Sequence, residues 1–218
     1  MKIRIRITIH QKTRVEAKLL QMSCLTTFVI ITLFGFLPKE AESQDKHPVD
    51  FSAWNVPKYI EANSAQNEDY FTDEEKKVYY YLNLVRMNPN LFAETYLFHI
   101  KISKDRYEST LYLQLRKLKP LPVLKPNRDL YESAKCHAIE SGDRGYSGHR
   151  RLKCKEYFMG ECCYYGNSDA LTIVLELLID QGISSMDHRK ICLSPYTQLG
   201  ISIQPHKDYG KNTVLDFK

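Results

Sequence analysis

A basic stretch followed by an apolar run near the start of the chain divides it into a segment with the pattern of a targeting signal and a longer segment that can fold. Residues 1–43 contain seven Lys and Arg side chains and three acidic ones, and the apolar run CLTTFVIITLFGFL extends from Cys24 to Leu37. A run of this length is typical of the core of a signal peptide, whereas a membrane span needs about 20 apolar residues. We therefore expect residues 1–43 to be a signal peptide and only the later residues to fold as a domain.

The end of this segment predicts where it is removed. Ala41 and Ser43 are small residues at the two positions that a signal peptidase reads, which predicts cleavage before Gln44 and export, either out of the cell or into a periplasm. The basic region before the apolar run is long, and a start at Met22 would leave a signal of more usual proportions. An uncleaved signal anchor is the alternative to cleavage.

The net charge of the chain, +5, lies mostly in the same segment, since residues 44–218 have a net charge of only +1. Nucleic-acid binding requires a basic surface on the folded part of a protein. A near-neutral domain therefore indicates no nucleic-acid partner, and the later residues contain no apolar stretch long enough for a stable transmembrane span. With 43% hydrophobic and 26% charged residues, the chain can form a globular core.

Local patterns predict where the domain begins. Residues 44–71 are polar with little periodicity and are expected to form an N-terminal extension, with the folded domain over residues 72–218. Thr72 and Glu75 have the spacing of a capping box, which predicts a helix starting there. The pair Asn88-Pro89 predicts the end of that helix and the start of the next.

Further helices and connections follow from the same signals. Residues 101–119 are basic with apolar positions at helical spacing, which indicates an amphipathic helix with a solvated basic face. Asn127 can cap another helix after a proline-rich connector, and glycines at 142, 145 and 148 predict a loop that leads to His149. A last long helix is expected from about Ser168 to Asp180.

The hydrophobic period changes near the C-terminus. Apolar residues alternate with small or polar ones from Leu199 to Ile203 and again around Leu215, which predicts two strands joined by a loop over residues 206–211. Helices that come first and strands that come last indicate an α+β fold rather than a βαβ repeat.

Two histidines and two carboxylates stand out in loops or at helix ends: His149, Glu161, Asp180 and His188. Such a set can bind a divalent cation such as Zn²⁺ through His149 and His188, with the acids as direct or outer partners. It can equally be a hydrogen-bond network in which each carboxylate orients an imidazole. His137 is expected to be an ordinary helix residue.

The cysteines fit an exported protein but leave an odd number after cleavage, because Cys24 belongs to the signal segment. At least one thiol must then be unpaired or bridge to another chain. The spacings contain no CxxC and give no disulfide connectivity. The five remaining cysteines are Cys136, Cys154, Cys162, Cys163 and Cys192.

Several short motifs occur in a characteristic order over residues 75–217. They are Leu82–Pro89, Leu130 with Ala134, His137 and Ala138, Gly148-His149, Gly160-Glu161, Asp187-His188-Arg189 and Leu199-Gly200-Ile201. In this order the chain resembles the CAP superfamily, which includes cysteine-rich secretory proteins, antigen 5 and pathogenesis-related proteins and is also described as SCP-like. The stretch LLIDQGISSMDHRKICLSP is similar to a bacterial-type subgroup.

The resemblance implies a three-layer α-β-α sandwich with a cleft lined by a His, Glu, Glu, His tetrad. By position, His149 and Glu161 are its first two members, and Asp180 and His188 its last two. Asp in place of Glu shortens the reach by one methylene, which puts direct metal contact at Asp180 in doubt. Asp187 is a rival for the same acidic role.

The cysteines mark another departure from the family. The family's Gly-Glu-Asn is Gly160-Glu161-Cys162 here, so the amide after the glutamate is missing. Cys162 or Cys163 could instead pair with Cys136, Cys154 or Cys192 and hold the cleft wall covalently.

The resemblance implies a secreted binding or interaction module, with lipids, sterols or extracellular proteins as partners and no activity general to the family. The alternative is a metal-assisted hydrolase, with His149 and His188 on Zn²⁺ and Glu161 as the general base. The chain has neither the G-x-S-x-G nor the HExxH signature, so we favour the binding module over an enzyme. A disulfide-held structural protein is the third hypothesis.

Overall fold

The two strands predicted near the C-terminus form the centre of a mixed sheet. The computed structural model describes residues 5–8 and 49–218. β4 (Gln198–His206) and β5 (Gly210–Phe217) pair as an antiparallel hairpin. β3 (Gly160–Tyr165) is antiparallel to the other edge of β5, with Glu161 directly opposite Asp216. This register places two carboxylates side by side.

Two short strands complete the sheet of the described residues, whose order is β1-β3-β5-β4-β2. β2 (Lys125–Pro126) runs parallel to β4, and β1 (Ile5–Thr8) runs parallel to β3. The predicted start at Met22, the apolar run and the cleavage before Gln44 all lie outside the described residues.

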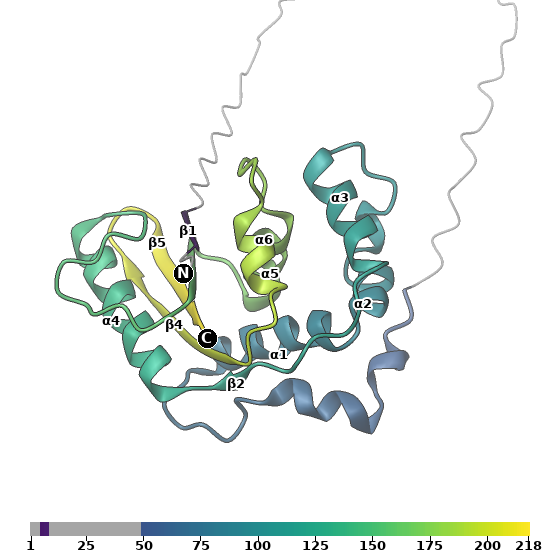
Figure 1. The fold of residues 1–218 in the computed structure, drawn as a ribbon, viewed down its shortest axis with the longest axis horizontal. Coiled ribbons are helices and arrows are strands. Elements are labelled where there is room, and N and C mark those ends of the chain that lie inside the picture. The colour runs from purple at the N-terminus through teal and green to yellow at the C-terminus, as the bar shows by residue number, and fades with distance from the viewer. Residues whose placement is uncertain (1–4, 9–48) are drawn as a thin grey trace, which may run out of the picture. The chain divides into compact units, whose positions relative to one another are not determined.

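Helices precede and interrupt the strands (Figure 1). They are α1 (Asp73–Met87), α2 (Pro89–Thr95), α3 (Arg106–Leu115), α4 (Arg128–Arg144), α5 (Ala170–Ile179) and α6 (Asp187–Cys192), with short 3₁₀ segments at Ser52–Trp54, Pro57–Asn63 and Phe98–Ile100. The α+β class predicted from the sequence is confirmed.

Local capping explains where the main helices begin. At α1 the hydroxyl of Thr72 accepts a hydrogen bond from the backbone N–H of Glu75, whose carboxylate accepts one from the backbone N–H of Thr72. This capping box satisfies N–H groups that have no partner inside the helix. Asn127 caps α4 in a similar way by accepting from Leu130.

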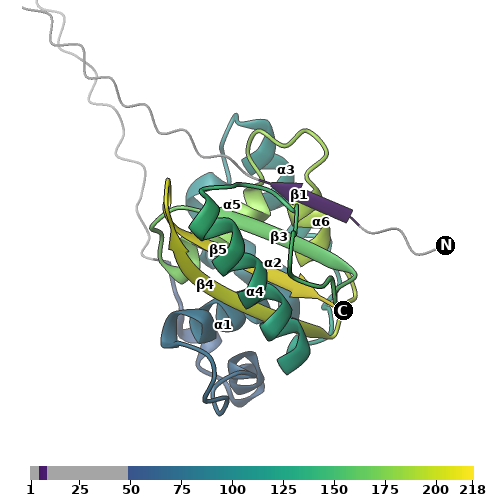
Figure 2. The same cartoon turned by 90° about the vertical axis from the view of Figure 1, so that its left-hand side faces the viewer.

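The sheet has helices on both faces (Figure 2). α4 packs on one face, against β4 and β5, and it approaches so closely that a Cβ on Gly200 would lie 2.1 Å from the backbone of Leu130. α1 contacts β4 from the other face, where the hydroxyl of Tyr79 donates to the carbonyl of Leu199. α5 and α6 also pack on β3, with α5 against α1.

The structure differs from the sequence-based expectation in four places. Gly142 lies inside α4 rather than in a loop, and its lack of a side chain leaves room for the carbonyl oxygen of Pro205. The helix ends at Gly145, whose φ is +62°. β3 and α6 were not predicted. The segment expected to be an N-terminal extension contributes Trp54 and Phe71 to the hydrophobic core.

Candidate functional site

The first predicted pair, His149 and Glu161, is formed by a loop and a strand. Glu161 lies on the face of β3 that α4 covers, and His149 lies in the loop over residues 145–159 that follows α4. Nδ1 of His149 lies 2.5 Å from Oε1 of Glu161. Glu161 is fully buried, whereas the side chain of His149 is 11% exposed, so the pair connects the interior with the surface.

Arg151, from the same loop, shares its charge between two acids. Its guanidinium donates to the carboxylate of Glu161 and, at 3.0 Å, to that of Asp216 on β5. Asp216 also accepts a 2.6 Å hydrogen bond from the hydroxyl of Ser133 on α4. Two buried carboxylates therefore face one buried cation across the β3–β5 register.

This arrangement moves the two acid pKa values in opposite directions. Burial favours the neutral form of Glu161, but the hydrogen bond from His149 and the charge of Arg151 outweigh it and lower the pKa to about 2. Burial, together with the nearby charge of Glu161, raises the pKa of Asp216 well above its ordinary value. Glu161 is thus the member of the carboxylate pair that holds the negative charge.

The second predicted pair, Asp180 and His188, joins the end of α5 to the start of α6. Asp180 ends α5 in the left-handed conformation, with a φ of 58°. Its Oδ1 lies 2.7 Å from Nδ1 of His188, and its Oδ2 accepts from the backbone N–H of His188 at 2.9 Å. Asp187, the rival candidate for the acidic role, instead pairs with Lys190 near the surface.

The two pairs contact neighbouring residues of β3 whose side chains point to opposite faces of the sheet. Sγ of Cys163 lies 3.7 Å from Nδ1 of His149, and Sγ of Cys162 lies 3.9 Å from the carbonyl oxygen of His188. The structure thus places the four expected residues in two imidazole–carboxylate pairs that flank β3. In each pair the carboxylate meets the Nδ1 atom of the imidazole.

A different set of side chains has the spacing of metal ligands. Within the described part of the chain, one group of three or more His, Cys, Asp or Glu side chains has ligand atoms that all lie within 4.8 Å of one another: His137, Glu161 and Cys163. Neither His149 nor His188 belongs to this group. The cation site expected at these two histidines therefore remains a hypothesis, since the described residues contain no group of ligand atoms that includes either of them.

One disulfide fixes the loop that carries His149 and Arg151. Cys136 on α4 is bonded to Cys154, while Cys162, Cys163 and Cys192 are free and buried. The disulfides considered between Cys162 or Cys163 and the other cysteines are therefore not formed. These two thiols lie on opposite faces of β3 and pack in the interior.

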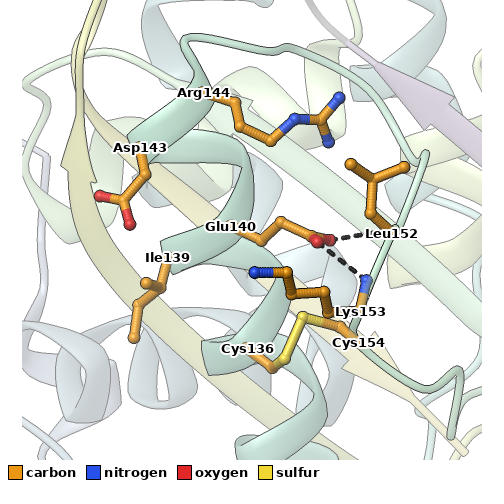
Figure 3. A pocket seen from close by; sticks show the side chains of 8 residues that line it. All are labelled: Cys136, Ile139, Glu140, Asp143, Arg144, Leu152, Lys153 and Cys154. Carbon is orange, nitrogen blue, oxygen red and sulfur yellow. Dashed lines mark hydrogen bonds between the residues drawn. A yellow bond between two sulfur atoms is a disulfide. The ribbon is translucent and has the colours of Figure 1, made fainter.

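The outer side of the same loop forms a pocket against α4 (Figure 3). Glu140 accepts hydrogen bonds from the backbone N–H groups of Leu152 and Lys153, next to the disulfide. The cavity has a volume of about 480 Å³. Two aliphatic side chains that line it are exposed, Ile139 at 41% and Leu152 at 56%. Charged side chains, including Arg144, surround this apolar area.

Sequence reasoning missed the residues that connect the site across the fold. Arg151 and Asp216 lie 65 positions apart in the chain, and nothing local marks them as partners. Asp216 does lie at an inward position of an alternating strand, and an acid at such a position was a usable signal. The sequence predicts an ordinary helix residue at His137, whereas in the fold it lies within the group of potential metal ligands.

Comparisons with known proteins add no relative to these observations. No family model matches the chain, and neither a curated protein nor a solved structure matches it. A search of the described residues also finds no helix with the length and apolar character needed to cross a membrane. The functional interpretation therefore depends on the residues and their geometry.

Proposed function

We propose that residues 72–218 form an exported binding module of the CAP type, with an α-β-α sandwich and two imidazole–carboxylate pairs in place of the family's tetrad. The order of the sequence motifs supports this proposal. So do the helices on both faces of the sheet and the contacts of His149 with Glu161 and of His188 with Asp180.

Binding agrees with the state of Glu161 better than hydrolysis does. A general base works best when its pKa is near the working pH. The pKa of Glu161 is lowered to about 2, and its carboxylate already accepts hydrogen bonds from His149 and Arg151. A carboxylate held in this way is a weak base, which favours the binding module over the metal-assisted hydrolase.

The class of ligand that we propose depends on the pocket between α4 and the 145–159 loop. Its volume lies in the range of small-molecule sites, and Ile139 and Leu152 expose apolar surface there beside charged groups such as Arg144. This combination suits a small amphipathic molecule, with its apolar body on the two aliphatic side chains and its polar end at the charged rim. Lipids or sterols belong to this chemical class.

The test measures uptake of a fluorescent sterol and a fluorescent fatty acid by the purified protein, together with extraction of any lipid that co-purifies. We expect Ile139→Asp and Leu152→Asp to weaken uptake at least tenfold, because each places a charge on the apolar area. Ile102→Asp is the matched control, since Ile102 is 73% exposed and does not line the pocket.

Uptake that persists in both pocket variants, or that is absent from the unaltered protein, contradicts the proposed ligand site. Conversion of an added ester into its products, abolished by Glu161→Gln in a protein that still folds, would instead establish the hydrolase.

A further inference from the structure

The face of β3 that α4 covers holds three different metal-ligating groups in a small volume. A ring nitrogen of His137, a carboxylate oxygen of Glu161 and the sulfur of Cys163 all lie within 4.8 Å of one another. Glu161 and Cys163 are two residues apart on a strand and therefore point to the same face, while His137 comes from the helix above them. All three side chains are fully buried.

The histidine in this group has a buried nitrogen atom without a partner. Nε2 of His137 lies 2.9 Å from the carbonyl oxygen of Gly148, which can only accept, so Nε2 carries the proton. Nδ1 then has a lone pair and no hydrogen-bond partner. A buried acceptor left in this state is unfavourable, and metal-ligating histidines usually donate one ring N–H to a carbonyl or carboxylate and present the lone pair of the other nitrogen to the metal.

Unpaired atoms are concentrated around this group. Five buried side-chain polar atoms of the described residues lack a hydrogen bond, and three of them belong to His137, His149 and Arg151. His149 is the member nearest to solvent, and its Nδ1 lies 3.7 Å from the Cys163 sulfur. Buried polar atoms in native proteins nearly always have partners, so the free lone pair on Nδ1 of His137 points to a missing one, whereas the Nε–H of Arg151 is a donor and has no bearing on a cation.

The charges around the group also suit a divalent cation. A dication bound by the Glu161 carboxylate and the Cys163 thiolate is locally neutral, and Arg151 keeps its hydrogen bonds to Asp216. Binding converts the Cys163 thiol to a thiolate and releases one proton to the solvent.

We propose that His137, Glu161 and Cys163 form a zinc-binding site between α4 and β3. Nitrogen, oxygen and sulfur ligands in one set favour Zn²⁺ over Ca²⁺ or Mg²⁺, which prefer oxygen alone. A fourth position remains for water. This site goes beyond the proposed function, because it uses neither His188 nor the outer pocket between α4 and the loop.

Titration of the chelator-treated protein with Zn²⁺ and with Co²⁺ tests the site. We expect one equivalent of either ion to bind, one proton to be released, and Co²⁺ to give the near-ultraviolet charge-transfer band of a thiolate ligand. Cys163→Ala should abolish this band and weaken Zn²⁺ binding at least tenfold, and His137→Gln should weaken binding by a similar factor.

Cys162→Ala is the matched control, because it removes the neighbouring buried thiol on the opposite face of β3. It should retain the band and the affinity. The band of the unaltered protein requires no variant, so it tests the thiolate ligand even if a substitution prevents folding. Absence of stoichiometric Zn²⁺ binding, a band that survives Cys163→Ala, or binding abolished by His188→Ala alone would overturn the proposal. None of these outcomes bears on lipid uptake at the outer pocket.

Discussion

The two imidazole–carboxylate pairs beside β3 have the same contact but different surroundings. In one, Asp180 bonds to the ring of His188 and also to the backbone N–H that begins α6. In the other, Glu161 bonds to the ring of His149 and shares Arg151 with a second acid, Asp216.

The difference extends to unpaired atoms and to exposure. Asp180 and His188 are fully buried, and neither contributes to the unpaired buried atoms of the described residues. Nε2 of His149 is such an atom, and part of its side chain reaches solvent. The Asp180 pair joins the end of α5 to the start of α6, and we propose that the Glu161 pair instead takes part in binding a ligand.

The largest expected effect is on the pair that holds α5 and α6. Asp180→Ala should lower the free energy of unfolding by about 3 kcal/mol, because it leaves the His188 ring and a helix N–H without their acceptor in the interior. Asp180→Asn should cost less, since Asn tolerates the left-handed conformation at this position and keeps one acceptor oxygen.

Asp187→Ala is the control for this measurement by denaturant titration. Asp187 forms a surface pair with Lys190, and such pairs contribute less than about 1 kcal/mol. Equal destabilisation by Asp180→Ala and Asp187→Ala would show that the buried pair has no special structural role.

The next effect concerns the loop that holds the Glu161 pair in place. Removing the Cys136–Cys154 disulfide with Cys136→Ser and Cys154→Ser should lower the free energy of unfolding by about 3 kcal/mol, because the bridge closes a loop between positions 18 residues apart. Hydrogen exchange should accelerate at the backbone amides of Leu152 and Lys153, which bond to Glu140.

Exchange in α6 provides the internal reference, since the disulfide does not contact that helix. Cys192→Ala is the control variant, because it removes a buried free thiol without changing any cross-link. If exchange accelerates equally in α6 and in the loop, the disulfide stabilises the whole fold rather than the site.

The parts of the fold that the sequence predicted are those determined locally. Thr72 and Asn127 cap helices through contacts three residues ahead, and the alternation from Leu199 to Ile203 lies within one strand. β3 had no such pattern, because all its residues are buried and successive side chains do not alternate between apolar and polar. A strand covered on both faces is hard to recognise from periodicity alone.

The candidate site divides in the same way. Asp180 and His188 are eight positions apart, and the order of motifs was sufficient to bring them to attention. The contacts of Arg151 with Asp216 and of His137 with the β3 face depend on the register of β3 against β5 and on where α4 lies. Neither contact can be predicted from the sequence without knowing how the strands pair.

The smallest effect we predict separates the two pairs by pH. The pKa of Glu161 falls from an ordinary 4.5 to about 2 in the folded protein, so its ionised form contributes its full stabilisation above pH 4.5 and loses it as the pH falls through 2. Asp216 acts in the opposite sense: its raised pKa stabilises the fold at low pH, and that contribution is lost as the pH rises through the folded value.

The two contributions change in largely different pH ranges, because Asp216 acts above its ordinary pKa of 3.8 and Glu161 acts below 4.5. Stability should therefore fall below pH 4.5 in the unaltered protein, and Glu161→Gln should remove the part of this fall that belongs to Glu161. The same substitution removes the charge that helps to raise the pKa of Asp216, so stability above pH 4.5 should also depend less on pH. Unfolding titrations between pH 2 and pH 7 measure both limbs, with Glu132→Gln on the exposed side of α4 as the control. A Glu161→Gln profile that coincides with the control would mean that Glu161 is not held as an anion by His149 and Arg151. The electrostatic difference between the two imidazole–carboxylate pairs would then be refuted.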